Sequence, residues 1–182
     1  MKPILLLTLV AITFASVMSP APAATSSVKA PALKVASHCA PGEKVVFTCA
    51  TTNAKLISLC SSSTLTPSDG YLQYRFGPGN KPELVYPATR EHPSKHFQFG
   101  HLIYSGGGGD FLKFMNGEYT YILFSALIKG EGDKSGVVVS KSGKQIAYLP
   151  CKGASQGDMN GDDFEKINIP RDKNEEAGFV IP

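Results

Sequence analysis

A run of four glycines stands between a serine and an aspartate near the middle of the chain. The segment reads Tyr104, Ser105, Gly106, Gly107, Gly108, Gly109, Asp110, Phe111. Glycine loses more backbone freedom on folding than other residues, so such a run indicates unusual backbone angles, close backbone approach or mobility. It is not a phosphate-binding loop, because the Gly-Lys-Ser/Thr sequence is missing and no helix is expected to follow. No βαβ unit surrounds it, as a dinucleotide fingerprint would require.

We interpret the glycine run as a long loop between two strands. Two alternatives stay open for its role. It is either a plain flexible connection or an insertion loop, held on a rigid scaffold, that fits the cleft of a partner.

The four histidines do not have the spacing of a metal site. They are His38, His92, His96 and His101. His92 and His96 are four residues apart, but Pro93 argues against the helix that would bring them together. On a strand they would lie about 13 Å apart, too far to bind one ion. We therefore expect exposed loop histidines and no metal or other cofactor.

An acidic turn resembles the start of a calcium loop. Asp158, Asn160 and Asp162 have the spacing of its first three ligands. However, Asp163 stands where such a loop needs glycine, and Ile169 where it needs a carboxylate. A hydrated acidic turn is the better interpretation.

No catalytic set is evident in the sequence. Ser105 is not part of a Gly-x-Ser-x-Gly elbow. The cysteines are expected to be oxidised, which removes a thiol nucleophile. A carboxylate pair among Asp110, Glu118, Glu131 and Asp133 would depend on tertiary structure alone. We therefore expect a protein that is not an enzyme.

Short strand-like runs separated by turn signals dominate the chain. The runs cover 44–49, 55–60, 71–76, 83–86, 96–104, 111–115, 118–128, 136–140 and 145–149. Asn116-Gly117 and Ser142-Gly143 between apolar runs predict tight hairpins. The pattern predicts an all-β fold: one antiparallel sandwich or barrel of about eight to nine strands. One short helical turn is expected at 162–167, with an aspartate as its cap.

Four cysteines predict two disulfides. Their spacing does not match a zinc site, and an even number in an exported chain indicates disulfides. If 44–49 and 55–60 form a hairpin that turns at Thr52-Asn53, Cys60 lies opposite Val45 or Phe47. Cys49 is then about 7 to 13 Å away from Cys60, too far for a bond. The hairpin therefore predicts the pairs Cys39–Cys60 and Cys49–Cys151.

The first residues have the features of a secretory signal peptide. Lys2 precedes an apolar run over 4–17, and Ala21-Pro22-Ala23 is a typical cleavage sequence. The run is too short to span a membrane, and no later run is long enough. We expect a signal peptide over 1–23, a flexible Ala/Ser/Pro/Lys-rich leader over 24–37 and a single β domain over 38–182, located in the periplasm or secreted, without a stable membrane anchor.

Charge gives little support to nucleic-acid binding. The net charge is only +3, and basic residues are not clustered with aromatic ones. The partner is therefore expected to be a protein or a glycan.

The order of these elements resembles the bacterial inhibitors of C-type lysozyme, which are small exported β-barrels with a late cysteine. The matching positions are Ser105, Phe111, Tyr121, Ser125, Lys129 and Gly130. Phe111 stands where that family has a tyrosine. The resemblance implies that the loop serine and the lysine reach two catalytic carboxylates of the target enzyme. The stretches 39–44 and 70–77 also resemble exported proteobacterial proteins, which implies export and disulfides.

The sequence thus predicts an exported binding protein that inhibits a peptidoglycan-degrading enzyme, either as a lysozyme inhibitor or as an immunity protein against a toxin. The expected contact surface is the segment 104–111 with Tyr121, Ser125, Lys129 and Gly130. The alternative is a module that binds a glycan or another ligand of the envelope, for which the aromatic candidates are Tyr71, Tyr74, Tyr119 and Tyr121. A hydrolase with an unrecognised site is a third, weaker alternative.

Overall fold

Nine strands form where the sequence pattern predicts them. The computed structural model describes residues 36–174 and 181–182. The predicted signal peptide and all but the last two residues of the predicted leader lie outside these ranges. The strands are β1 (Lys44–Ala50), β2 (Lys55–Ser61), β3 (Leu72–Pro78), β4 (Leu84–Tyr86), β5 (Gln98–Tyr104), β6 (Gly107–Asn116), β7 (Tyr119–Ile128), β8 (Gly132–Lys141) and β9 (Lys144–Pro150). The short helix α1 (Gly161–Lys166) and a 3-10 turn (Pro93–Lys95) are the helical elements of the described residues.

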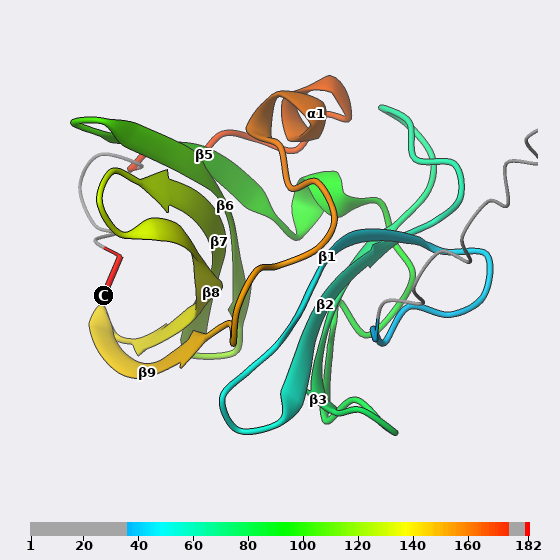
Figure 1. The fold of residues 1–182 in the computed structure, drawn as a ribbon. Helices are drawn as coiled ribbons and strands as arrows, with labels where there is room; N and C mark the ends of the chain where they lie inside the picture. The colour runs from blue at the N-terminus through cyan, green and yellow to red at the C-terminus, as the bar shows by residue number, and fades with distance from the viewer. Residues whose placement is uncertain (1–35, 175–180) are drawn as a thin grey trace, which may run out of the picture. The chain divides into compact units, whose positions relative to one another are not determined.

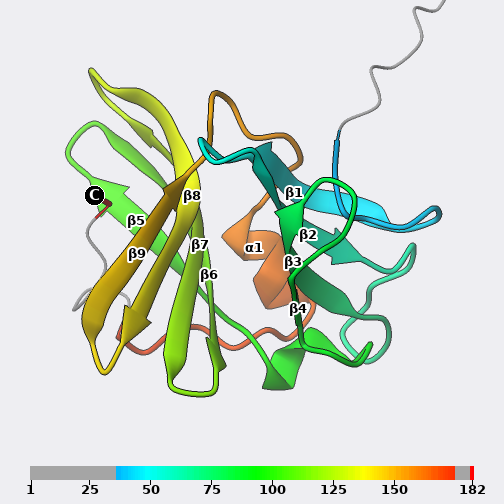
Figure 2. The ribbon, with the colours of Figure 1, turned by 90° about the horizontal axis from the view of Figure 1, so that it is seen from below.

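The strands form two antiparallel meanders. One sheet has the order β1-β2-β3-β4 and the other the order β5-β6-β7-β8-β9, and α1 lies at one end of the sheets (Figures 1 and 2). The predicted hairpins are present. Gly117, Ser142 and Gly143 have φ of 60°, 49° and 74°, as two-residue hairpin turns require. The all-β prediction is confirmed, and two packed sheets make the fold a sandwich.

An aromatic core joins the two sheets. Phe47, Ile57 and Tyr74 from the four-stranded sheet pack with Phe99 and Leu123 of the five-stranded sheet in one buried cluster. Burial of one such side chain contributes about 2 to 3 kcal/mol. The rings lie in ordered contact: the centroids of Tyr74 and Phe114 are 5.1 Å apart. This shared core holds the two meanders together.

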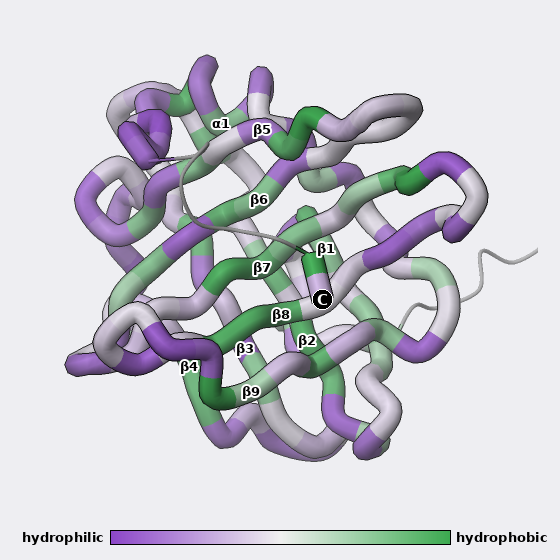
Figure 3. Tube along the Cα trace, turned by 90° about the vertical axis from the view of Figure 1, so that its left-hand side faces the viewer, coloured by the Kyte–Doolittle hydropathy of each residue, from purple (hydrophilic) through white to green (hydrophobic). Residues whose placement is uncertain are grey.

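The opposite face of the five-stranded sheet is also apolar. Leu102, Phe111, Phe124 and Val138 form a second buried cluster, against which Ile181 near the C-terminus packs. Figure 3 faces this side and shows apolar stretches on neighbouring strands. With both faces covered, the sheet has continuous apolar runs instead of strict alternation. The sequence of β7, YTYILFSALI, has this pattern.

The glycine run is not a long loop, which corrects the sequence prediction. Gly107, Gly108 and Gly109 belong to β6 and pair with β5, and Gly108 and Gly109 also pair with β7. A Cβ on Gly107 or Gly109 would overlap the carbonyl oxygen of Leu127 or Ser125, and one on Gly108 would lie 2.8 Å from that of Leu102. The glycines therefore allow close backbone approach between paired strands near one end of the sheet.

Both predicted disulfides are confirmed. Cys39 bonds Cys60 and Cys49 bonds Cys151, and Cys60 lies opposite Val45 as the hairpin argument requires. By loop-closure entropy, cross-links over 21 and 102 residues stabilise the fold by about 3 and about 5 kcal/mol. The second disulfide ties β1 to the segment that follows β9.

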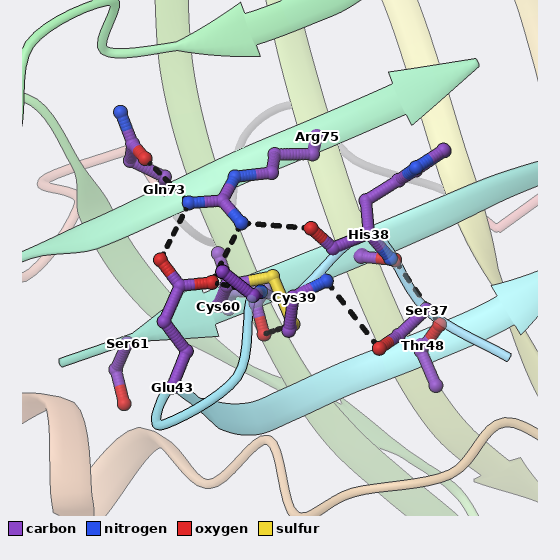
Figure 4. Close-up of a disulfide and its surroundings, with 12 residues drawn as sticks. Ser37, His38, Cys39, Glu43, Thr48, Cys60, Ser61, Gln73 and Arg75 are labelled. Atoms are coloured by element: carbon purple, nitrogen blue, oxygen red, sulfur yellow. Dashed lines mark hydrogen bonds and ion pairs between the residues drawn. A yellow bond between two sulfur atoms is a disulfide. The ribbon is translucent and has the colours of Figure 1, made fainter. Parts of the chain in front are cut away.

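A buried ion pair lies beside the first disulfide (Figure 4). The carboxylate of Glu43 accepts hydrogen bonds from both terminal nitrogens of Arg75, at 2.6 and 2.7 Å. The Ala40 N–H and the Tyr71 hydroxyl donate to it at 2.6 and 2.8 Å. Arg75 also donates to the His38 carbonyl. The network fixes the chain that leads into β1. The Glu43 carboxylate lies close to the sulfurs of Cys39 and Cys60, but these are bonded to each other and cannot act as thiolate ligands.

The pKa of Glu43 reflects this network. Burial alone would raise the pKa, but the hydrogen bonds from Arg75, Ala40 and Tyr71 and the Arg75 charge outweigh burial and lower it to about 2. The side chain is only 4 % exposed. A carboxylate whose pKa is lowered on folding stabilises the protein above its unfolded pKa and loses that contribution as the pH falls through its folded pKa.

We expect Gly109→Ala to lower the free energy of unfolding by at least about 2 kcal/mol, because the new Cβ overlaps the Ser125 carbonyl. Chemical denaturation measures the change. Gly79→Ala is the control, since its Cβ meets only the Leu56 side chain, at 3.8 Å, and is expected to stay within about 0.5 kcal/mol of the wild type. Equal stability of the two variants would refute the close-approach explanation.

We expect the ion pair to make the fold acid-sensitive. The wild type should lose about 3 kcal/mol of stability between about pH 4.5 and pH 2 through Glu43. Glu43→Gln should cost about 3 to 5 kcal/mol at neutral pH, because Arg75 stays buried without its counter-charge, and should flatten this part of the stability profile. Glu83→Gln is the control, because its pair with Lys55 is exposed and contributes less than about 1 kcal/mol. Urea unfolding across this pH range measures the stability of both variants. If Glu43→Gln has the same pH dependence of stability as the wild type, the acid sensitivity does not come from Glu43.

Candidate functional site

Two predicted contact segments meet at one corner of the five-stranded sheet. Ser105 and Gly106 form the turn between β5 and β6, and Lys129 and Gly130 lie in the turn between β7 and β8. The turns touch: a Cβ on Gly106, whose φ is 87°, would lie 2.7 Å from the Cδ of Lys129. We call residues 103–107 and 127–131 the turn corner. Ser105, Gly106, Lys129 and Gly130 are exposed there.

The turn corner also carries two exposed apolar side chains. Ile103 is 89 % exposed and Leu127 is 56 % exposed. Both pair with Gly108, which lies between them on the same face of the sheet. Because Gly108 has no side chain, it leaves a space between the two aliphatic groups. The two aliphatic side chains form a small exposed apolar patch beside a hydroxyl and an ammonium group.

The apolar pattern of the sequence does not predict that Ile103 and Leu127 are exposed. Each lies in an apolar run that reads as a buried strand. Their exposure follows from the length of the five-stranded sheet, which carries both residues past the shared core. The one sequence feature that could indicate their exposure is their position next to the predicted turns.

A row of polar side chains lies directly behind the turn corner. His101, Asp110, Ser125 and Ser135 occupy paired positions on four adjacent strands. His101 Nδ1 and Asp110 Oδ1 are 2.6 Å apart, and Gly161 of α1 packs against both, since a Cβ there would lie 2.5 to 2.6 Å from their atoms. The row therefore fixes α1 on β5 and β6.

The polar row does not have the order of a catalytic triad. A triad places histidine between the nucleophile and the carboxylate. Here Asp110 lies between His101 and Ser125 in the register of the sheet. The arrangement orients the imidazole but does not bring it to the Ser125 hydroxyl.

One predicted contact residue, Phe111, is buried, and several others are only partly exposed, which corrects the sequence prediction. Phe111 is 1 % exposed and belongs to the second apolar cluster. Tyr121 stacks on Phe114 with centroids 4.8 Å apart, near the other end of β7. Tyr104 packs on the second cluster, and Asp110 and Ser125 lie in the polar row. Gly107, Gly108 and Gly109 are strand residues whose backbone shapes the corner.

The four tyrosines proposed for glycan binding do not form a platform. Tyr74 is 1 % exposed, and burial raises the pKa of its hydroxyl. Tyr71 donates to Glu43, and Tyr121 lies in the aromatic stack. Tyr119 is at the surface, with the Lys141 ammonium 5.4 Å from its ring centroid. Tyr74 is too buried to stack on a sugar, and Tyr121 contacts it within the core, with ring centroids 6.3 Å apart.

The histidines and the acidic turn have structural partners. His92 caps the 3-10 turn, and His96 contacts Glu91 at 2.8 Å. Asn160 accepts the Asp162 N–H at 2.9 Å and caps α1. The predicted helical turn is confirmed, but the cap is Asn160 rather than an aspartate. Asn160 thus uses its side-chain oxygen within the fold.

Comparison with known proteins gives no match. No protein-family model matches the sequence, and neither the curated proteins nor the solved structures contain a significant match. No helix among the described residues is long and apolar enough to cross a membrane. Function must therefore be argued from the geometry of the chain itself.

Proposed function

We propose that this chain is an exported binding protein that inhibits a peptidoglycan-degrading enzyme of the envelope. The observation that supports the proposal is the contact between the two turns, which presents Ser105 and Lys129 together on an exposed corner. The two groups come from segments 24 residues apart, and they are the pair that the resemblance to lysozyme inhibitors requires.

The chemistry of the target supports this pairing. Glycosidases that cleave the wall use two carboxyl groups on either side of the scissile bond, about 5 to 10 Å apart. A hydroxyl can donate to one carboxylate, and an ammonium forms a charge-assisted hydrogen bond with the other. The turn corner carries one hydroxyl donor, on Ser105, and one ammonium donor, on Lys129, on a narrow projection.

The Lys129 ammonium is available for a partner. Among the described residues it forms no ion pair, whereas neighbouring Lys134 bonds Glu131 at 2.6 Å. That hydrogen bond raises the pKa of Lys134 and neutralises part of the local charge. Lys129 is therefore the cation that an acidic cleft would meet.

The rigidity of the corner supports inhibition rather than catalysis. Both turns connect strands of one continuous sheet, so little conformational entropy is lost when they enter a cleft. Ile103 and Leu127 would pack on the walls beside the polar centre. The disulfides fit an oxidising location, and we propose the periplasm or the cell exterior, after removal of residues 1–23. An immunity protein against a secreted toxin would use the same surface.

We expect the mature protein to inhibit C-type lysozyme, or another envelope glycosidase in a panel of such enzymes, with one-to-one stoichiometry. Lys129→Ala and Ser105→Ala should each weaken inhibition about 10- to 100-fold, because each removes one hydrogen bond to a carboxylate. Cell-wall hydrolysis and isothermal titration calorimetry measure the effect.

Lys144→Ala provides the matched control. Lys144 is an exposed lysine at the start of β9, beside the turn at the opposite end of the sheet, so its removal should leave inhibition unchanged. Equal inhibition by Lys129→Ala and Lys144→Ala would exclude the turn corner as the contact surface. Glycan binding without enzyme binding would favour the alternative function.

A further inference from the structure

The five-stranded sheet has a notch above Gly108. Ile103, Gly108 and Leu127 are paired side by side on β5, β6 and β7, so their side-chain positions share one face. Around the position that a Cβ on Gly108 would take, the described atoms within 4 Å belong to the Leu102 backbone, and the nearest is its carbonyl oxygen at 2.8 Å. No described side chain therefore fills the space above Gly108.

Two exposed aliphatic side chains form the walls of this notch. Ile103 is 89 % exposed and Leu127 is 56 % exposed, so both can be reached by a partner. Their backbones are two strand spacings apart, about 10 Å, and Gly108 places no side chain between them. A flat ring that stands between the two walls would remove apolar surface from water on both of its faces.

Two hydrogen-bond acceptors lie at the inner end of the notch. Asp110 and Ser125 are paired with each other and are the next residues on the same face of β6 and β7, about 7 Å along the strands from Gly108 and Leu127. One oxygen of Asp110, Oδ1, is 2.6 Å from His101 Nδ1. Within the described part of the chain, neither the other Asp110 oxygen nor the Ser125 hydroxyl has a hydrogen-bond partner. The Asp110 side chain is 22 % exposed, so a group in the notch can reach it.

We propose that the notch receives a tyrosine side chain of the partner enzyme. The ring would lie over Gly108 between Ile103 and Leu127, and the hydroxyl would donate to Asp110 beside Ser125. The distance of about 7 Å between the two rows matches the reach of a tyrosine side chain. This inference rests on the function proposed above, in which the turn corner enters the cleft of an enzyme, and it names a group that the enzyme supplies.

The chemistry of the notch selects against other side chains. Phenylalanine would fill the space between the walls but would displace water from Asp110 and Ser125 without offering a donor. Arginine would offer donors to Asp110 but would place part of its charged group against the aliphatic side chains of Ile103 and Leu127. Tyrosine is apolar up to its tip and carries one donor there.

A titration without any enzyme tests the notch. N-acetyltyrosinamide is added to the mature protein while backbone amide shifts are recorded by NMR. We expect saturable shifts at residues 103, 108, 110, 125 and 127 and none at residues 144–148. N-acetylphenylalaninamide and N-acetylargininamide should each bind at least about threefold more weakly. Equal or tighter binding of either one, or no saturable shift at these residues, would overturn the proposal. Binding of the probe by a protein that inhibits no enzyme would refute only the proposed inhibition.

Two variants test the wall and the acceptor separately. Leu127→Ala removes one wall and should weaken binding of N-acetyltyrosinamide at least about threefold. Ile146→Ala is the control, because Ile146 is similarly exposed, at 53 %, but lies on β9 outside the notch, and it should leave binding unchanged. Ser125→Ala should reduce the preference for the tyrosine probe over the phenylalanine probe, which a purely structural role of Ser125 would not affect. The amide spectra report whether each variant is folded. A folded Leu127→Ala protein that binds the probe as the wild type does would rule out the notch.

Discussion

The close approach of β6 to its neighbours is the constraint on which the candidate site depends. At Gly107 and Gly109 the carbonyls of β7 occupy the space where a Cβ would lie, and at Gly108 a carbonyl of β5 comes within 2.8 Å of that position. Three strands can therefore run together to the end of the sheet. The two turns that follow come into contact, so that Gly106 packs on Lys129. The glycine run allows the strand backbones to pack closely, and the exposed functional groups lie on the turns.

The rest of the sandwich supplies the rigidity that this corner needs. The shared aromatic core holds the two sheets together. Cys39–Cys60 joins the segment before β1 to β2, and Cys49–Cys151 joins β1 to the segment that follows β9. The Glu43–Arg75 pair satisfies two charges in a buried setting. Such a pair adds little net stability over an apolar replacement, but the loss of one partner would leave the other uncompensated. It therefore acts mainly to define the path of the chain into β1.

The two ends of β6 differ in chemistry. The turn corner is convex and exposed, with one hydroxyl, one ammonium and two aliphatic groups, and it is suited to the cleft of another protein. Toward the other end of β6, Phe114 is buried between the stacked rings of Tyr86 and Tyr121.

By itself, the sequence determined the local features of this protein. Apolar runs and turn residues located all nine strands, and the hairpin at Thr52-Asn53 led to both disulfide pairs. These features depend on residues that are close together in the sequence, so the sequence pattern predicts them. Only the tertiary structure decided the role of the glycines, the burial of Phe111, the packing of Tyr121 on the core and the exposure of Ile103 and Leu127. Each of these depends on which strands lie alongside and on where the second sheet ends, and such distant contacts leave no local pattern in the sequence.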